Sequence, residues 1–410
     1  MNVCVIGGGA SGSLCAIKLA DYGHKVTLYE KNEKIGKKLY ITGKGRCNLT
    51  NATTGNEFLS HVVNGSKFMM SAETRFNSTD TMELFKSFGV PLKVERGNRV
   101  FPQSDKSSDI IAALTNALKM KKVKVVLGTT VQDIVTEEGK AVGVVVNNKV
   151  ENYDAVVVAT GGKSYAATGS TGDGYVWAQK TGHTIVEPVP SLVGIFVKDK
   201  DIFALEGLSL KNVTVSAVID GKTIYKSPVG EMLFIDGGIS GPIVISMSAY
   251  INRIDISNAK VYIDFKPALS SEQLHQRINR EIAGLGAKQI SSLLETLLPK
   301  SLCGIVANRI GVLMEDKANQ MSATQRDNLV NTLKHFDLSI DHLEGFERAV
   351  ITSGGVSTKQ VSPRNMQSKL IKNLYFIGEV LDIDALTGGF NLQLAFSTAV
   401  ACASDLKENN

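Results

Sequence analysis

Two short hydrophobic runs separated by a helical pattern open the chain. Residues 2–6 (NVCVI) have the continuous apolar pattern of a buried strand, and three glycines follow them. From Gly12 to Tyr22 the apolar side chains recur at helical spacing, and residues 25–29 form a second apolar run that ends at Glu30. The pattern therefore predicts a βαβ unit at the N-terminus.

The next part of the chain also mixes helical and strand patterns. Residues 106–120 place their apolar side chains on one face of a predicted helix. Four runs rich in β-branched residues follow, at 123–127, 131–135, 141–146 and 154–159. A glycine-studded loop then leads into another helix, so the α/β pattern continues through this part of the chain.

The pattern changes at Pro188 and Pro190, which mark a predicted domain boundary. Beyond them the chain has the alternating apolar and polar positions of half-buried strands. Asp220-Gly221 lies between two of these strands and is a two-residue hairpin signal. This part is therefore predicted to be rich in antiparallel strands.

A helical pattern extends from residue 271 to about residue 335. Within it, Ser322 and Gln325 have the spacing of a capping box, in which each side chain accepts a hydrogen bond from the other residue's backbone N–H. The segment contains few strand formers. We expect it to form a small helical domain.

The C-terminal segment returns to the order strand, loop and helix. Residues 373–380 form the strand pattern, and a helix is predicted from about Phe390 to Leu406. We therefore expect an α/β fold with a Rossmann-like domain built from both chain ends and interrupted by β-rich and small helical domains. The expected domains are 1–190 with 346–410, 191–268 with 336–345, and 269–335.

Length and charge limit the classes of function. The chain has 410 residues, which is too long for one core, since domains have about 100–200 residues. The net charge of +5 is small against 45 basic and 40 acidic side chains, and no block of like charge indicates a nucleic-acid or membrane surface. We therefore expect a small-molecule substrate, and the sequence says nothing about the oligomeric state.

The cysteines and histidines argue against a disulfide framework and against a metal site. The five cysteines are scattered without a CxxC pair, and the six histidines show no ligand spacing. The chain opens directly on a strand, so neither a signal peptide nor a transmembrane helix is expected. These features predict a cytoplasmic enzyme without a bound metal.

The first strand–helix junction, GGGASG (residues 7–12), fits the pattern GxGxxG. Gly7 permits a tight turn, Gly9 lets the backbone approach a pyrophosphate, and Gly12 lets the helix pack closely on the strand. Amides at the helix N-terminus would face the phosphates, and the Glu30 carboxylate would accept both ribose hydroxyls. We therefore predict binding of a dinucleotide, FAD or NAD, with a glycine-rich turn that holds no ligand as the alternative.

Two distal segments favour FAD. The strand in 153–162 ends in Thr160-Gly161-Gly162, which would bring backbone beside the dinucleotide; the alternative is a simple strand terminus. In GEVLDIDALTGGFNLQLAF (378–396) a strand leads to acids and then to a predicted helix N-terminus. Amides there could stabilise the anionic reduced flavin, and the alternative is an ordinary capped helix.

A third segment, ITGKGRCNLTN (41–51), combines glycines with polar side chains. Together with "ATGG", "SLVGIF", "LFIDGGISGPIVI" and "GEVLDIDALTGGFNLQLAFSTA" it resembles the BaiN-type (YhiN-like) family of bacterial FAD-dependent oxidoreductases, which includes enzymes described as aminoacetone oxidases. The resemblance covers nearly the full length in the same order. Thr42 and Lys44 depart from it, because the family often has serine and a third glycine there.

The resemblance implies three domains and non-covalent FAD, bound by the loop after the ribose acid and by the two distal segments. No catalytic residue is predicted. Together with the dinucleotide fingerprint, the predicted cofactor-binding residues are Gly7, Gly9, Ala10, Ser11, Gly12, Glu30, Lys31, Lys37, Thr42, Gly43, Arg46, Cys47, Asn48, Val131, Thr160, Gly161, Gly162, Gly378, Glu379, Asp384, Gly389, Asn391 and Leu392.

For two residues of this segment, Arg46 and Cys47, a functional role has to be weighed against a structural one. Arg46 is expected to neutralise the pyrophosphate or to hold an anionic substrate or a flavin carbonyl, and a surface salt bridge is its alternative. Cys47 has no second cysteine close in the sequence with which to form a redox pair. We therefore expect Cys47 to be a small packed side chain beside the flavin rather than a nucleophile.

The predicted activity is that of an FAD-dependent oxidoreductase, which moves hydride between a small organic substrate and flavin N5. The insertion contains no second strand–GxGxxG–helix unit, so NAD(P)H is expected only as a transient electron donor. Whether the enzyme is an oxidase or a reductase stays open. The alternatives are a flavin-dependent tRNA-modifying enzyme, which a basic stripe across the insertion would indicate, and a non-catalytic FAD redox sensor.

Overall fold

The computed structural model describes residues 1–408, which form two compact units. Unit 1 joins residues 1–190 to the C-terminal segment that begins at Phe346, and unit 2 extends from Ser191 to Gly345. Each unit has its own hydrophobic core. Both ends of the chain thus belong to one unit, and the middle of the chain is inserted in it.

Unit 1 contains most of the helices and strands. Its α-helices are α1 (Ala10–Asp21), α2 (Gly55–Leu59), α3 (Ser66–Arg75), α4 (Ser78–Ser87), α5 (Ser107–Met120), α6 (Asp173–Lys180) and α12 (Phe390–Glu408). Its strands are β1 (Asn2–Ile6), β2 (Lys25–Tyr29), β3 (Thr50–Asn51), β4 (Val62–Asn64), β5 (Leu92–Glu95), β6 (Arg99–Pro102), β7 (Lys124–Val126), β8 (Val131–Glu137), β9 (Lys140–Val146), β10 (Lys149–Asn152), β11 (Ala155–Val158), β12 (Ile185–Ser191), β20 (Ile351–Val356), β21 (Leu374–Phe376) and β22 (Asp384–Ala385). Its short 3₁₀ helices are η1 (Leu39–Gly45), η2 (Ala166–Thr168), η5 (Thr358–Gln360) and η6 (Gly378–Val380).

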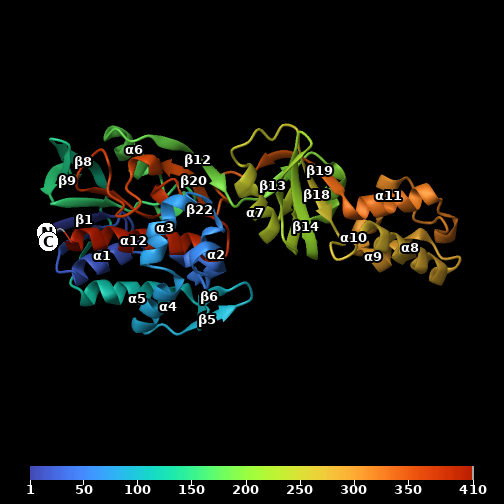
Figure 1. Cartoon of the computed structure of the whole chain (residues 1–410), viewed down its shortest axis with the longest axis horizontal. Coiled ribbons are helices and arrows are strands. Elements are labelled where there is room, and N and C mark those ends of the chain that lie inside the picture. Colours follow the sequence, from blue (N-terminus) through green and yellow to red (C-terminus); the bar gives the residue numbers. More distant parts are fainter. Residues whose placement is uncertain (409–410) are drawn as a thin grey trace. The chain divides into compact units, whose positions relative to one another are not determined.

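A five-stranded parallel sheet in the order β21-β11-β1-β2-β7 forms the centre of unit 1. Helices α1, α5 and α12 lie on one side of β1, and the β8–β9 hairpin lies on the other (Figure 1). Because all five strands are parallel, their carboxyl ends share one edge, which is where open α/β sheets bind ligands. The GGGASG turn follows β1 at this edge, and Glu30 follows β2.

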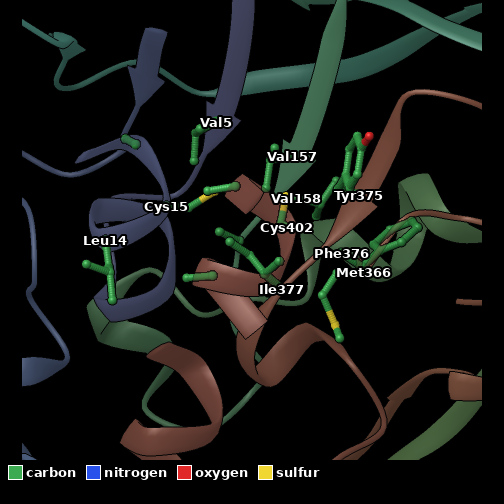
Figure 2. Close-up of a cluster of buried hydrophobic side chains, with 14 of the residues drawn as sticks. Val5, Leu14, Cys15, Val157, Val158, Met366, Tyr375, Phe376, Ile377 and Cys402 are labelled. Atoms are coloured by element: carbon green, nitrogen blue, oxygen red, sulfur yellow. The ribbon is translucent and has the colours of Figure 1, made fainter. Parts of the chain in front are cut away.

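The core of unit 1 lies between this sheet and helices α1 and α12. Strands β1 and β11 are covered on both faces, so their apolar residues form continuous runs rather than alternating ones. Figure 2 shows Val5 and Val157 of the sheet in one cluster with Cys15 of α1 and Cys402 of α12. Small side chains allow α1 and α12 to pack closely, which brings the C-terminal helix to the N-terminal fingerprint.

Small sheets join segments of unit 1 that are far apart in the sequence. Strands β3, β6 and β5 form one antiparallel sheet, β22 pairs with β4, and β12 pairs with β20. The β22–β4 pair holds the segment before α12 against the N-terminal part of the chain. The expected cofactor segment before α12 is therefore fixed to β4 by backbone pairing.

Unit 2 contains the remaining elements. Its helices are α7 (Pro242–Ile251), α8 (Ser271–Leu285), α9 (Ile290–Leu297), α10 (Lys300–Ile310) and α11 (Ala323–Lys334), with 3₁₀ helices η3 (Lys200–Leu205) and η4 (Ala318–Gln320). Its strands are β13 (Ile195–Val197), β14 (Ser209–Ile219), β15 (Lys222–Lys226), β16 (Gly230–Ile235), β17 (Gly238–Ser240), β18 (Ala259–Asp264) and β19 (Phe336–Leu343).

The strands of unit 2 form one sheet in the order β15-β14-β16-β17-β13-β19-β18, and an additional β14–β18 pairing closes the sheet on itself. Asp220 and Gly221 both have positive φ, as a type I′ turn requires, and they join β14 to β15. The predicted hairpin and the predicted Ser322–Gln325 capping box are both confirmed. One hydrophobic core continues from the strands into α8–α11.

The predicted α/β fold with a Rossmann-type sheet is confirmed by this architecture. One local expectation differs, because part of segment 41–51 is not an irregular loop. The 3₁₀ helix η1 enters it, and the backbone leaves helical geometry at Thr42, Gly43 and Lys44. Gly43, Lys44, Gly45 and Cys47 all have positive φ, so the chain is tightly folded at this point.

Candidate functional site at the carboxyl edge of the unit 1 sheet

The turn after β1 requires glycine at two positions and leaves open space at a third. Gly7 has a φ of +106°, and a Cβ on it would lie 2.5 Å from the carbonyl oxygen of Ala159. A Cβ on Gly12 would overlap the carbonyl oxygen of Gly7, whereas a Cβ on Gly9 would meet nothing within 4 Å. The first two glycines therefore allow close packing, and Gly9 leaves the N-terminal end of α1 accessible to a ligand.

The Glu30 carboxylate lies beside this turn and is held by backbone and side-chain donors. It is buried, and it accepts hydrogen bonds from Gly8 N at 2.7 Å, from Asn32 N at 2.8 Å and from Asn32 Nδ2 at 2.7 Å. The Asn32 amide also donates to the carbonyl of Thr168 at 3.0 Å. The acid is thus fixed in position at the carboxyl edge of the sheet.

Two lysines near Glu30 are engaged by protein groups. Lys31 Nζ donates to Asp173 at 2.7 Å and to Thr171 at 2.5 Å. Lys37 Nζ lies 3.4 Å from Asn32 Oδ1 and 3.4 Å from Glu33 Oε2. Lys31 therefore links the ribose-acid loop to the start of α6, and neither lysine has a free ammonium group in this arrangement.

The two distal segments converge on the fingerprint. Gly378 has a φ of +72°, and a Cβ on it would lie 2.5 Å from Ser11 Oγ in the first turn of α1. Gly161 has a φ of +75°, and its Cβ position lies 3.8 Å from Glu379 Oε2. Thr160-Gly161-Gly162 and Gly378-Glu379 thus lie together at the carboxyl edge of the sheet.

An ion pair at this edge was not expected. Lys38 Nζ lies 2.8 Å from Glu379 Oε2 and 2.7 Å from Ser164 Oγ. The other oxygen of Glu379 accepts hydrogen bonds from Thr352 N at 2.9 Å and from Ser164 Oγ at 3.2 Å. Lys38 directly follows Lys37 in the sequence, and no spacing rule distinguishes the two lysines.

In segment 41–51, Arg46 has protein partners. Its guanidinium donates to Asp105 at 2.8 Å through Nε, pairs with Glu95 and lies over the Phe101 ring at 4.1 Å. Its pKa is raised because Glu95 and Asp105 accept its hydrogen bonds. This is the arrangement expected of a surface salt bridge, and a role for Arg46 toward a cofactor stays a prediction.

Cys47 is fully buried within the same turn. Its backbone N–H donates to the carbonyl of Thr42 at 3.0 Å, and Thr42 Oγ1 donates to Leu39 O at 2.7 Å. Burial raises the pKa of the Cys47 thiol to about 12. The thiol therefore stays protonated near neutral pH and is a poor nucleophile.

Buried polar atoms in this region lack hydrogen-bond partners among the described residues. They are the side-chain oxygens of Asn48 and Thr160, both of which belong to the predicted cofactor set. Buried polar groups are almost always satisfied, so each such atom needs an explanation. The ribityl and ribose hydroxyls and the flavin N3–H of FAD are donors of the kind these acceptors lack. Together with the open space at Gly9, these atoms fit a bound FAD.

The segment before α12 is braced mainly by the protein itself. A Cβ on Gly389 would overlap the backbone of Thr50. Asn391 accepts from Ala385 N at 2.9 Å and donates to Ala385 O at 2.8 Å, and Asp384 Oδ1 accepts from Ser353 Oγ at 3.0 Å. Leu392 is half-buried against the core, and Val131 is buried at the start of β8.

Other kinds of site find no support in the described part of the chain. Within residues 1–408 no group of three or more His, Cys, Asp or Glu side chains is arranged to hold a metal ion. No single helix in that range is long and apolar enough to cross a membrane. All five cysteines are buried and free.

A parallel sheet with a glycine turn after its first strand and a buried acid after its second defines a Rossmann-type dinucleotide-binding fold. The chain belongs to the HI0933-like protein Rossmann domain family, whose model matches residues 1–405. The family resemblance in the sequence is thereby confirmed.

Curated relatives match almost the whole chain. A 3-dehydro-bile acid delta(4,6)-reductase from Clostridium scindens is 32% identical over 97% of this chain and 97% of its own length. A ribosomal RNA dihydrouridine synthase from Haemophilus influenzae is 32% identical over 97% of this chain and 96% of its own length. The chain is thus an oxidoreductase.

Solved structures share the fold at low sequence identity. The 3-ketosteroid delta1-dehydrogenase from Sterolibacterium denitrificans superposes with a TM-score of 0.54 at 14% identity. The match covers 100% of this chain and 99% of that chain. At this identity the likeness supports the architecture alone.

Proposed function

We propose that this enzyme is a reductase that saturates a carbon–carbon double bond conjugated to a carbonyl in a small organic substrate. The observation that carries the proposal is the chemistry shared by the two full-length relatives. A 3-dehydro-bile acid delta(4,6)-reductase and a dihydrouridine synthase both reduce a double bond that is conjugated with a carbonyl group. Such bonds accept hydride at the carbon β to the carbonyl, and FAD supplies that hydride from N5 when it is bound and reduced.

All the residues that we propose for FAD lie in unit 1, which we assign as the FAD-binding domain. Gly7, Gly9 and Gly12 let the backbone approach the pyrophosphate, and Glu30 accepts the ribose hydroxyls. The side-chain oxygens of Asn48 and Thr160 accept from the cofactor, which satisfies two otherwise unpaired groups. The further proposed contacts are Ala10, Ser11, Lys31, Lys37, Thr42, Gly43, Arg46, Cys47, Val131, Gly161, Gly162, Gly378, Glu379, Asp384, Gly389, Asn391 and Leu392.

The electrons for this reduction are proposed to come from NAD(P)H, bound transiently. The balance is one hydride from the nicotinamide to the flavin, then one hydride from the flavin and one proton to the two carbons of the double bond. No residue is assigned as the proton donor. A cytoplasmic location, where NAD(P)H is available, is part of the proposal and agrees with five free cysteines.

RNA is the competing substrate class, because one relative is named for ribosomal RNA. Unit 2 contains 16 Lys and Arg against 17 Asp and Glu, so the insertion has no basic excess. Proteins that bind nucleic acid generally neutralise several phosphates with clustered basic residues. The charge balance of unit 2 therefore favours a small substrate.

The experiment is anaerobic turnover of the FAD-loaded enzyme with NADH or NADPH and one of three acceptors. The acceptors are a 3-oxo-4-ene steroid, its saturated analogue and a uridine-containing ribosomal RNA fragment, and the products are identified by mass spectrometry. The proposal expects a gain of two hydrogens in the unsaturated steroid only. Reduction of the RNA alone would replace it with the RNA-modifying activity, and an enzyme whose flavin is reduced but passes electrons to none of these acceptors would favour the redox sensor.

A further inference from the structure

The Lys38–Glu379 ion pair joins four segments of unit 1. Lys38 comes from the turn before η1, and Glu379 lies in η6. Ser164, which follows the Thr160-Gly161-Gly162 turn, bonds both members of the pair, and Thr352 of β20 donates its backbone N–H to Glu379. The side chains of Lys38 and Glu379 are only 23% and 22% exposed, so water screens this ion pair less than a fully exposed one.

The glycines of the neighbouring turn wrap the carboxylate. A Cβ on Gly162 would overlap Thr352 Oγ1 and lie 3.3 Å from the Glu379 carboxyl carbon. Thr352 Oγ1 in turn accepts the backbone N–H groups of Lys163 at 2.8 Å and Ser164 at 3.0 Å. This close packing of the Gly162 turn and Thr352 holds the Glu379 carboxylate in a fixed position.

The order of the strands places this pair relative to the two ends of a dinucleotide. In the sheet β21-β11-β1-β2-β7, the ribose acid Glu30 follows β2, and the glycine turn that receives the pyrophosphate follows β1. A dinucleotide whose phosphates cross the end of β1 has its other half on the side of β11 and β21. Glu379 follows β21, and the turn that wraps it follows β11. The ion pair therefore lies on the side of the flavin half.

We propose that the charges of Lys38 and Glu379 shift the reduction potential of the bound flavin in opposite directions, and that their pairing keeps these two shifts balanced. The inference rests on the FAD binding that is part of the proposed function. Two-electron reduction at neutral pH adds one proton and two electrons, supplied as hydride, so the flavin gains one negative charge. The lysine charge favours this reduced form and the carboxylate charge opposes it, so in the intact ion pair the two effects largely cancel.

The test compares Lys38→Gln, Glu379→Gln and the double variant Lys38→Gln/Glu379→Gln. The midpoint potential of bound FAD is measured by equilibration with reference dyes, without any substrate or nicotinamide. We expect Lys38→Gln to shift the potential to more negative values and Glu379→Gln to shift it to more positive values. The double variant, which again has no net charge at the site, is expected to return close to wild type.

Two controls separate this electrostatic role from a structural one. Lys121→Gln and Asp21→Asn remove a matched ion pair, with an N···O distance of 2.5 Å, at the opposite end of α1, and they are expected to leave the potential unchanged. Lys38→Arg keeps the positive charge and is expected to have the wild-type potential. This variant keeps the test possible if Lys38→Gln binds FAD poorly. Shifts of the same sign in both single variants, or no shift in either, would overturn the inference. The proposed function is tested separately, by turnover of the wild-type enzyme, so the two can fail independently.

Discussion

The backbone N–H of Gly8 donates a 2.7 Å hydrogen bond to the buried carboxylate of Glu30. This bond ties the turn after β1 to the end of β2, so the proposed pyrophosphate site and the proposed ribose site form one rigid edge. Asn32 donates twice to the other carboxylate oxygen and also reaches the carbonyl of Thr168. The ribose acid is thus positioned before any ligand arrives.

Replacing Glu30 with Gln is expected to weaken FAD binding about tenfold or more. Hydrogen bonds to a charged group contribute about 1.5–3 kcal/mol, and about 1.4 kcal/mol corresponds to a factor of ten in affinity. The dissociation constant is measured by titrating FAD into the apoprotein. Glu33→Gln is the matched control, because Glu33 follows Glu30 by three residues and its side chain is 66% exposed. Equal affinity for Glu30→Gln and wild type would contradict the assignment of Glu30.

Alanine at Gly9 and at Gly12 is expected to have opposite consequences. A methyl group at Gly12 would overlap Gly7 O, so Gly12→Ala should lower the thermal stability of the apoprotein. Gly9 has a negative φ and open space around its Cβ position, so Gly9→Ala should leave apoprotein stability unchanged and reduce FAD affinity. Thermal unfolding and FAD titration of both variants test this. A Gly9→Ala variant with wild-type affinity would show that no ligand occupies the space.

Cys47 is expected to be dispensable for turnover and to contribute a pH dependence to stability. The folded-state pKa of its thiol, about 12, lies above the ordinary value of 9.0. Above pH 9 the unfolded thiol loses its proton while the folded one keeps it, so this contribution to stability falls as pH rises toward 12, by about 1.4 kcal/mol per unit. Denaturant unfolding of wild type and Cys47→Ala from about pH 8 to about pH 11 should show a shallower decline of stability in the variant. Loss of turnover in Cys47→Ala with FAD still bound would instead indicate a chemical role.

Gln393 is expected to be a stabilising residue of unit 1. Its carbonyl oxygen accepts from Thr50 at 2.7 Å and from Thr81 at 2.8 Å, and its amide donates to Phe76 O at 3.2 Å. Gln393→Ala leaves these buried groups unpaired, which should cost about 2–4 kcal/mol of unfolding free energy. Hydrogen exchange of the α12 amides measures the loss, and the exposed Gln103→Ala is the control. Unchanged protection of α12 would contradict the network's role.

Local signals in the sequence accounted for much of the fold. The glycine turn, the Asp220-Gly221 hairpin and the Ser322–Gln325 capping box depend on neighbours a few residues away, and each forms as predicted. Strand burial in β1 and β11 likewise follows from continuous apolar runs. The conformation of residues whose partners are near in the sequence can therefore be predicted without a structure.

Side-chain and strand partners that are far apart in the sequence could not be predicted from it. Lys38 and Glu379 are 341 residues apart in the sequence, and nothing local distinguishes Lys38 from Lys37. The partners of Arg46 are set by the way β5 and β6 pair, which places Glu95 and Asp105 beside it. The closure of the unit 2 sheet through β14 and β18 depends on a strand pairing that periodicity alone does not specify.

The central claim is that bound, reduced FAD passes hydride to a carbonyl-conjugated double bond. The most direct measurement is a single turnover in which the enzyme, reduced under anaerobic conditions, is mixed rapidly with a 3-oxo-4-ene steroid while the flavin absorbance is followed. The account predicts that the oxidised flavin spectrum returns in one phase and that one equivalent of saturated product forms. Flavin that stays reduced with the unsaturated steroid, as it does with the saturated analogue, would contradict the account.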